Sequence, residues 1–310
     1  VAAKDRKGNP GYGVDGADEK SFATDWLMDR TIDFIDEHKG GPFAYMVSIP
    51  DPHGPDTVRA PYDTMFSDDE VEKPRTYAKD RATAPSWGMP AKKCPWKMAS
   101  YHGMIKCIDD NVGKLIAALK ERDLYDRTIV IFTADHGDMR GEHGLQNKGY
   151  PMEASAKIPF VIRWPGGIEA GQTVRRAMNT TDFCPTILSL TGAEPTGFEE
   201  GRDMAPAFQG EEMKSVDVTF SRSTTQSAES NTGWIAAVSP THKLILSDKD
   251  KPWLIDLVSD PDEMTNVVDE PDQKEIAKFL ATQLHAYGTR CKDPKIDHPN
   301  TAEGLSQLMA

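Results

Sequence analysis

The chain has 310 residues, of which 38% are hydrophobic and 27% are charged, and its formal net charge is −13. This composition is typical of a globular protein, and the length suits one large α/β domain or a large domain with a smaller one. The negative charge argues against a general affinity for nucleic acid or an anionic membrane, because its field repels both. No run of about 18 apolar residues occurs, so the sequence predicts no transmembrane helix.

A helix and then a strand are predicted near the start of the chain. Residues 21–38 place Trp26 and Ile32 on a broad apolar face, which favours a helix. A Gly-Gly-Pro turn ends it, and residues 43–49 (FAYMVSI) form the predicted strand. The following loop holds His53 between prolines, which restrict the backbone and help to place the side chain. The alternative interpretation is a proline-rich turn with a solvent-exposed histidine.

A long irregular segment separates this strand from the clearest helix. Residues 60–95 are charged and Pro-rich and include Trp87. So long an irregular segment is uncommon in a compact domain, and it fits either a cover over an active site or a surface excursion. Residues 99–122 repeat apolar side chains at three- and four-residue intervals, which predicts a helix. Asp109 and Asp110 within it are interpreted as solvated or capping charges.

Residues 129–132 (IVIF) form the predicted central strand, because a short apolar, β-branched run suits a strand buried on both faces of a parallel sheet. Asp135 and His136 follow at once. In open α/β sheets, ligands bind beyond the carboxyl ends of the strands. The glycine-rich loop that comes next carries His143 and Lys148. The sequence therefore predicts the active site here, with a metal or a charged substrate.

The pattern of predicted elements changes towards the C-terminal part of the chain. A strand is predicted over residues 158–164 and a short helix over 183–190. Beyond them, short strands separated by turn residues predict an antiparallel sheet, with a flexible loop at 221–231. A final amphipathic helix, about 273–287, is expected to cover one face of that sheet. The predicted domains are 1–213 and 214–310, and the predicted strands of the second are 216–220, 234–238, 243–246 and 253–257.

The four cysteines are widely spaced and lack the CxxC pairing of a zinc or redox site. Disulfides and plain buried thiols are both compatible with this spacing, and the disulfide state stays open. The cysteines are Cys94, Cys107, Cys184 and Cys291.

Several motifs, in this order and spacing, resemble the type I sulfatases of the alkaline-phosphatase-like superfamily. They are DPHGP, YHGMIKCIDDNVGKLIAAL, FTADHGD, GEHGL with a following lysine, KIPFVIRWPGG, TDFCPTILSLTG and WLIDLVSDPDEMTNV. The resemblance runs across most of the chain. It implies an α/β fold with a doubly wound mixed sheet and helices on both faces, followed by a smaller C-terminal antiparallel sheet with a covering helix.

The resemblance also implies roles for individual residues. Asp135 and His136 match two ligands of a divalent cation, usually calcium, that binds the sulfate. His136 stands where many relatives have Asn, so the identity of the metal stays open to magnesium, manganese or zinc. Lys148 matches the lysine that contacts the sulfate. His53 matches the histidine that contacts the sulfate and donates a proton to the leaving oxygen. His143 lies near the substrate in this pattern, while Glu153 and Arg163 are interpreted as structural.

One departure from the family is serious. Such enzymes use a formylglycine nucleophile made within a C/S-x-P/A-x-R signature, and no cysteine or serine here has it. The paired N-terminal aspartates of the metal site are also absent. The hypothesis is that the chain is the C-terminal portion of a sulfatase, whose partner is the missing N-terminal segment of the same enzyme. A signal peptide is expected in that segment, which implies an extracellular or periplasmic location.

The leading hypothesis is hydrolysis of a sulfate ester, with a sulfated saccharide as the expected substrate. A non-catalytic sulfatase-like binding or partner chain is the first alternative, and a phosphatase or phosphonate hydrolase of the same superfamily is the second. The particular ester, the metal and the oligomeric state are not readable from the sequence.

Overall fold

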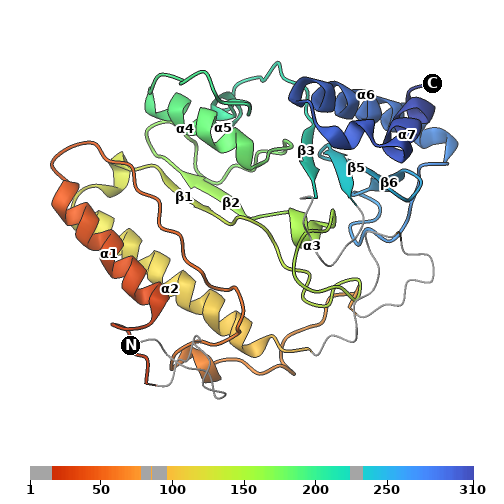
Figure 1. Cartoon of the computed structure of the whole chain (residues 1–310). Helices are drawn as coiled ribbons and strands as arrows, with labels where there is room; N and C mark the ends of the chain where they lie inside the picture. The colour runs from red at the N-terminus through yellow and green to blue at the C-terminus, as the bar shows by residue number, and fades with distance from the viewer. Residues whose placement is uncertain (1–15, 78–84, 86–95, 224–232) are drawn as a thin grey trace. The chain divides into compact units, whose positions relative to one another are not determined.

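The computed structural model describes residues 16–77, 85, 96–223 and 233–310 (Figure 1). The chain divides into two compact units: Val1–Lys73 with Pro95–Ile129, and Pro74–Cys94 with Val130–Ala310. The predicted boundary at 213/214 lies inside the second unit, and the division into 1–213 and 214–310 stays a prediction. Cys94, Trp87 and most of the predicted loop 221–231 lie outside the described residues.

The first unit is built on two long helices, α1 (Ala23–His38) and α2 (Ala99–Glu121), which lie side by side in Figure 1. Both confirm the helices predicted from apolar spacing. The ion pairs Asp29–Lys114 and Asp36–Arg122 join them in the same order along both helices, so the helices run in the same direction.

Short 3₁₀ turns flank α2: η1 (Tyr62–Thr64) precedes it and η3 (Tyr125–Arg127) follows it. The predicted strand over residues 43–49 was wrong, because this segment lies outside any strand. Its Met46 side chain is 87% exposed. An apolar run becomes a strand only where a neighbouring strand satisfies its backbone groups. The core of the unit is instead made of Phe22, Val58, Tyr62, Met104 and Cys107.

The second unit begins with β1 (Val130–Thr133), which pairs with β2 (Phe160–Arg163). Both strands lie where the sequence predicted them. The pairing is antiparallel, however, and neither strand is fully buried: Phe132 is 42% exposed and Val161 is 62% exposed. Burial on both faces was therefore wrong for β1, which has a single hydrogen-bonded neighbour in the described part of the chain.

In the sequence, short helices lie between the two strands of this sheet and after them. Between β1 and β2 lies α3 (Glu153–Ala156). After β2 come η4 (Thr180–Asp182), α4 (Phe183–Thr191) and α5 (Ala205–Phe208). The capping box of η4, in which Asn179 and Asp182 satisfy each other's backbone N–H groups, explains why the helix predicted over 183–190 starts where it does.

A four-stranded antiparallel sheet follows, with its strands in chain order, and confirms the predicted C-terminal sheet. Helix α6 extends beyond the predicted 273–287, and the sequence interpretation missed the last helix, α7. The elements are β3 (Thr219–Arg222), β4 (Trp234–Val238), β5 (His242–Ser247), β6 (Trp253–Asp256), η5 (Pro271–Gln273), α6 (Lys274–Cys291), η6 (Pro294–Asp297) and α7 (Pro299–Met309).

The two faces of this sheet have different covers. Side chains alternate along β4, so Ile235 and Ala237 pack with α6 and α7, while Trp234 and Ala236 face the other way. On that second face the sheet packs against the chain between β1 and α3, including Met139, Leu145, Tyr150 and Met152. The predicted helix therefore covers one face as expected, and the loop that follows β1 covers the other.

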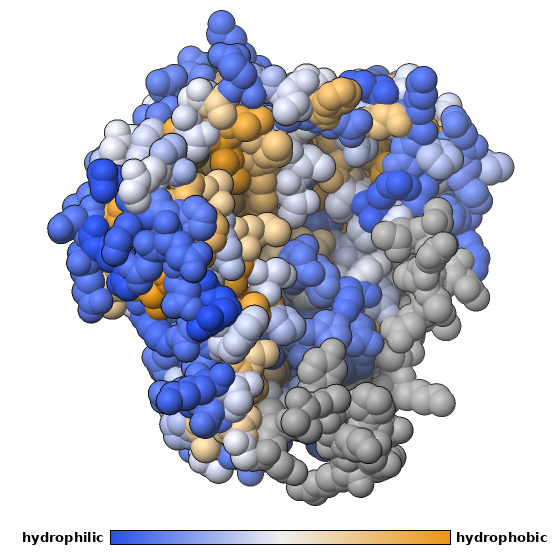
Figure 2. All heavy atoms as spheres, turned by 60° about the vertical axis from the view of Figure 1, so that its left-hand side comes forward, coloured by the Kyte–Doolittle hydropathy of each residue, from blue (hydrophilic) through white to orange (hydrophobic). Residues whose placement is uncertain are grey.

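Hydrophobic residues also reach the surface at several places among mainly hydrophilic side chains (Figure 2). None of the helices in the described ranges is long and apolar enough to span a membrane.

Candidate functional site

Asp135 and His136 lie two and three residues beyond the end of β1. The Asp135 side chain is 86% exposed, and its Oδ2 lies 3.5 Å from Nε2 of His136. His136 Nδ1 is 2.8 Å from the carbonyl oxygen of Gly137. A carbonyl only accepts hydrogen bonds, so Nδ1 is the donor, and in the neutral ring Nε2 carries the lone pair.

This geometry suits a shared positive charge. A carboxylate oxygen and an imidazole lone pair repel each other at 3.5 Å unless a proton or a cation lies between them. Two donors at right angles on a calcium ion lie roughly 3.3–3.7 Å apart, given bonds of about 2.3–2.6 Å. Asp135 and His136 thus fit two positions of a coordination sphere. Among the described residues, no group of three or more His, Cys, Asp or Glu side chains is arranged to hold a metal ion.

Gly137 is required by the close approach of α3 to this turn. A Cβ at this position would lie 2.1 Å from the carbonyl oxygen of Ala154. The absence of a side chain lets the Gly137 N–H donate to Ser155 O at 2.9 Å. Asp135 and His136 therefore leave the strand on a backbone that is tied to α3.

The loop between Gly137 and Gly149 is compact. Met139 N donates to Asn147 O at 2.8 Å, and Gly141 N donates to Leu145 O at 2.8 Å. Met139 and Leu145 are fully buried against the four-stranded sheet. Several residues in the loop take positive φ, which its glycines adopt without strain; they are Arg140, Gly141, His143, Gly144, Asn147 and Gly149.

Lys148 is exposed on this loop, between two residues whose backbones are held. Asn147 accepts the bond from Met139, and the Gly149 N–H donates to Ser155 Oγ at 3.0 Å. The ammonium group therefore extends from a fixed backbone on the same loop as Asp135 and His136.

His143 lies differently. Its side chain is 2% exposed, and its backbone N–H donates to Thr76 O at 2.9 Å. The residue is thus packed inside the loop, and its contact with substrate stays a prediction.

His53 belongs to the first unit, so its place beside Lys148 also stays a prediction. The residue is exposed, and its Nδ1 lies 2.8 Å from Gly54 O. Asp51, two residues earlier, accepts a 2.5 Å hydrogen bond from Thr24 Oγ1. Burial raises the pKa of the Asp51 carboxyl.

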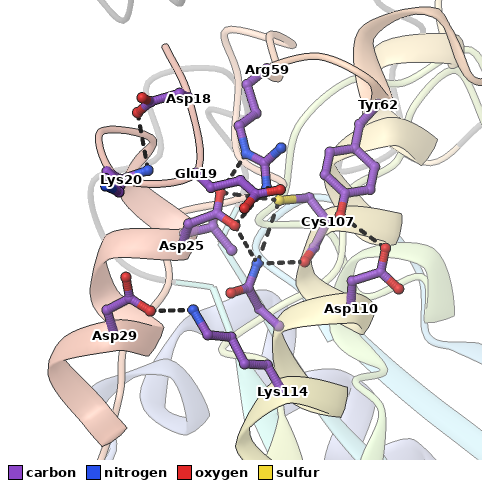
Figure 3. A network of polar contacts seen from close by, with 12 residues as sticks. Asp18, Glu19, Lys20, Asp25, Asp29, Arg59, Tyr62, Cys107, Asp110 and Lys114 are labelled. Carbon is purple, nitrogen blue, oxygen red and sulfur yellow. Dashed lines mark hydrogen bonds and ion pairs between the residues drawn. The ribbon is translucent and has the colours of Figure 1, made fainter. Parts of the chain in front are cut away.

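The far end of the His53 loop is held by a buried network (Figure 3). Arg59 donates to both oxygens of Asp25 at 2.7 Å, and Asn111 Nδ2 donates to the same carboxylate at 3.1 Å. Burial opposes ionisation of Asp25, but the bonds from Arg59 and Asn111 keep its pKa below the ordinary value. Burial raises the pKa of the neighbouring Cys107 thiol to about 12. The network therefore fixes the loop to α1 and α2.

Sequence reasoning missed a second buried network, in the second unit. Lys243 Nζ donates to Glu153 Oε1 at 2.6 Å and to Glu263 Oε1 at 2.8 Å. Burial raises the pKa of the Glu263 carboxyl, whereas at Glu153 the charges of Lys243 and Lys157 together outweigh burial and lower the pKa. The structural role expected for Glu153 fits this ion pair. The one sign of this network in the sequence was a lysine, Lys243, within the mainly apolar strand sequence HKLILS.

Comparisons with known proteins agree with the sequence resemblance. The family model "Sulfatase" matches residues 3–193, and the model "N-sulphoglucosamine sulphohydrolase, C-terminal" matches residues 141–290. An arylsulfatase of Clostridium perfringens is 28% identical over 282 residues, which cover 86% of this chain and 57% of that protein. An N-acetylglucosamine-6-O-sulfatase of Bacteroides thetaiotaomicron is 27% identical over 263 residues, covering 82% of this chain and 46% of that protein. The chain thus spans about half the length of these curated relatives.

Solved structures confirm the predicted α/β, alkaline-phosphatase-like fold. A protein solved with its substrate D-glucosamine-2-N,6-O-disulfate superposes with a TM-score of 0.79 at 20% identity, over 88% of this chain and 70% of that one. A phosphonate monoester hydrolase of Agrobacterium radiobacter superposes with a TM-score of 0.74 at 25% identity, over 91% of this chain and 62% of that one.

Proposed function

This chain belongs to the sulfatase family, and we propose that the protein hydrolyses sulfate esters, with sulfated saccharides as its substrate class. The observation that carries the proposal is the end of β1, where Asp135 and His136 stand together on the loop that also presents Lys148. An anionic ester needs such a local positive site in a chain whose net charge is −13.

The proposal assigns a divalent cation, calcium in the first place, to Asp135 and His136. Bound there, the cation would offset the charge of the sulfate group and polarise its S–O bonds. The formylglycine nucleophile belongs to the proposal as well. The 310 residues hold no C/S-x-P/A-x-R signature, so we assign this nucleophile to a part of the protein outside them.

Two residues of this chain are proposed to act on the substrate. Lys148 neutralises charge on the sulfate oxygens, which is most valuable as charge develops in the transition state. His53, with its imidazole doubly protonated, donates the proton of its Nε2 to the leaving oxygen while Nδ1 stays hydrogen-bonded to Gly54 O. General acid help of this kind contributes about 10²–10⁴ in rate.

Sulfated glucosamine derivatives are the proposed first substrates to test. One relative is named an N-acetylglucosamine-6-O-sulfatase, and one structural neighbour was solved with a disulfated glucosamine. We also propose an extracellular or periplasmic location, as for the relative named a putative extracellular sulfatase in Caenorhabditis elegans.

A second candidate function is hydrolysis of phosphonate monoesters. Its support is the likeness to the phosphonate monoester hydrolase of Agrobacterium radiobacter, whose identity of 25% is in the range of the sulfatase relatives. A tetrahedral phosphonate presents oxygens that the same cation and lysine would bind. Both functions would therefore use the same residues of this chain, and they differ in whether the protein prefers sulfate esters or phosphonate monoesters.

The test is a substrate panel with the full-length protein: 6-O-sulfated N-acetylglucosamine, a phosphonate monoester and a phosphate monoester. We expect the highest kcat/KM on the sulfate ester. Lys148→Ala should lower it by roughly 10²–10³, as removal of a transition-state donor does. Lys157→Ala is the matched control, because Lys157 is also exposed, 3.6 Å from Glu153 at the end of α3. Preference for the phosphonate ester favours the second function, and no turnover at all favours a binding chain.

A further inference from the structure

Ser155 lies where both ends of the loop that carries the candidate site meet. Its carbonyl oxygen accepts the N–H of Gly137, one residue after His136. Its hydroxyl accepts the N–H of Gly149 at 3.0 Å, one residue after Lys148, and the N–H of Tyr150 at 3.3 Å. The two ends of the loop, twelve positions apart in the sequence, are thus bonded to one residue. Ser155 itself is 3% exposed.

The segment after Lys148 is held further by the four-stranded sheet. Trp234 Nε1, on β4, donates to Gly149 O at 3.0 Å. Lys243 Nζ, on β5, donates to Pro151 O at 2.7 Å. Each bond joins a side chain of the sheet to the backbone within three residues of Lys148.

Glu263 completes this set of contacts. Its Oε2 accepts the Glu153 N–H at 2.6 Å, which caps the start of α3 where no local side chain does so. Its other oxygen accepts from Lys243 at 2.8 Å. Lys243 is 1% exposed and Glu263 is 2% exposed, so the pair is a rigid buried support and not a surface ion pair.

We propose that Ser155, Lys243 and Glu263 are positioning residues, through which the C-terminal sheet sets where His136 and Lys148 lie relative to each other. None of the three is placed against substrate. They act on the backbone at Gly137, Gly149, Pro151 and Glu153, and because Ser155 is bonded to both ends of the loop, a shift of Ser155 moves both ends.

Hydrophobic packing alone does not give this result. Met139, Leu145 and Met152 attach the loop to the sheet, but apolar contacts are non-directional and tolerate a shift of the backbone. The hydrogen bonds to Ser155, Lys243 and Glu263 are directional, and a displacement of about 1 Å lengthens them beyond a bonding distance. The polar contacts therefore determine position, while the apolar ones contribute most of the stability.

The first part of the test is amide hydrogen exchange in the full-length protein, which does not depend on turnover. Ser155→Ala removes the hydroxyl, and we expect Gly149 and Tyr150 to exchange roughly tenfold faster, the factor for one lost hydrogen bond. Ser155→Thr keeps a hydroxyl and should restore slow exchange. Ser239→Ala is the matched control, because Ser239 Oγ also accepts backbone N–H groups, at Thr241 and His242, in the turn between β4 and β5.

The second variant carries Lys243→Met with Glu263→Met. Replacing a buried ion pair by apolar side chains is often neutral for stability. The Glu153 carboxylate, which loses Lys243 in this variant, is 28% exposed and still has Lys157 at 3.6 Å. We nevertheless expect faster exchange at Gly149 and Glu153, since the directional bonds are gone. Unchanged exchange at these amides in both this variant and Ser155→Ala would overturn the proposal.

The activity arm rests on the proposed function. With a sulfate ester as substrate, Ser155→Ala should lower kcat/KM by roughly ten- to a hundredfold, the cost of misplacing a reacting group by about 1 Å. Ser239→Ala should leave it within about twofold. If the wild-type protein shows no turnover, the proposed function fails, and the exchange measurements still decide the positioning role. If turnover is present but insensitive to Ser155→Ala, the positioning role fails alone.

Discussion

The buried pair Arg59–Asp25 gives the sharpest stability prediction in the first unit. The change is Arg59→Met, which removes the guanidinium and keeps a long apolar side chain. In the native protein both side chains of the pair are buried, with 5% and 7% exposed, and the shortest N–O distance is 2.7 Å. After the change, the Asp25 carboxylate keeps its hydrogen bond from Asn111 but loses its only strong counter-charge at bonding distance among the described residues.

The size of the effect follows from burial. Removing one partner of a buried pair leaves an uncompensated charge and costs about 3–5 kcal/mol. The same chain offers a matched pair at the surface: Arg30 and Asp33 also lie 2.7 Å apart, but both are 52% exposed. Such an exposed pair contributes about 0.2–1 kcal/mol. Arg30→Met should therefore cost several-fold less than Arg59→Met, although the two pairs join the same residue types at the same shortest distance.

The assay is urea denaturation of the wild type and the two variants, with the free energy of unfolding taken at equal m values. The expected order is wild type, then Arg30→Met close to it, then Arg59→Met well below. Equal losses for the two variants would contradict this prediction, because burial would then not decide the strength of the pair. A third variant, Asp25→Leu with Arg59→Met, should recover part of the loss, since it removes the buried charge.

Three further predictions concern single residues. Gly137→Ala should destabilise the second unit by about 1–3 kcal/mol through overpacking, because its Cβ would lie 2.1 Å from a backbone oxygen. In the same denaturation assay, Gly113→Ala in helix α2 should stabilise the protein by about 1 kcal/mol, because its Cβ would meet nothing within 4 Å. The folded-state pKa of Asp25 lies below its usual 3.8, so its ionised form stabilises the fold above that pH, and this contribution is lost as the pH falls through the lower pKa. The free energy of unfolding of the wild type should therefore fall more steeply below about pH 4 than that of Asp25→Asn. Parallel curves of the two proteins would contradict this. A thiol reagent should label exposed Cys184 in the native state and leave buried Cys107, whose pKa is raised to about 12, unlabelled until unfolding; equal labelling rates by mass spectrometry would contradict this.

Local patterns predicted the helices and the C-terminal sheet well. The apolar spacing of residues 99–122 is a property of the sequence alone, and α2 ends within one residue of the predicted bound. The segment 43–49 has the composition of a strand, yet it lies outside any strand. Strand formation depends on a neighbour that the local sequence does not specify, which is also why the antiparallel pairing of β1 with β2 was not anticipated.

For the candidate site, too, only the residues that lie close together in the sequence could be predicted. Asp135, His136 and Lys148 are close in sequence and follow a recognisable strand, so their shared loop was predictable. Ser155 and Glu263 were not, because a serine and a glutamate have many roles and theirs depend on contacts made across the fold. Glu263 and Glu153 meet over 110 positions in the sequence. Only the three-dimensional structure relates the C-terminal sheet to the loop after β1.

The proposed ester hydrolysis depends on a cation bound by Asp135 and His136. The most direct measurement is the divalent metal content of the purified full-length protein and of its Asp135→Asn variant, with Asp138→Asn as the control. Asp138 lies on the same loop but is paired with Arg140 at 3.0 Å. We expect bound metal and sulfate ester turnover in the wild type and in Asp138→Asn, and loss of both in Asp135→Asn. Unchanged metal content in Asp135→Asn would contradict this expectation.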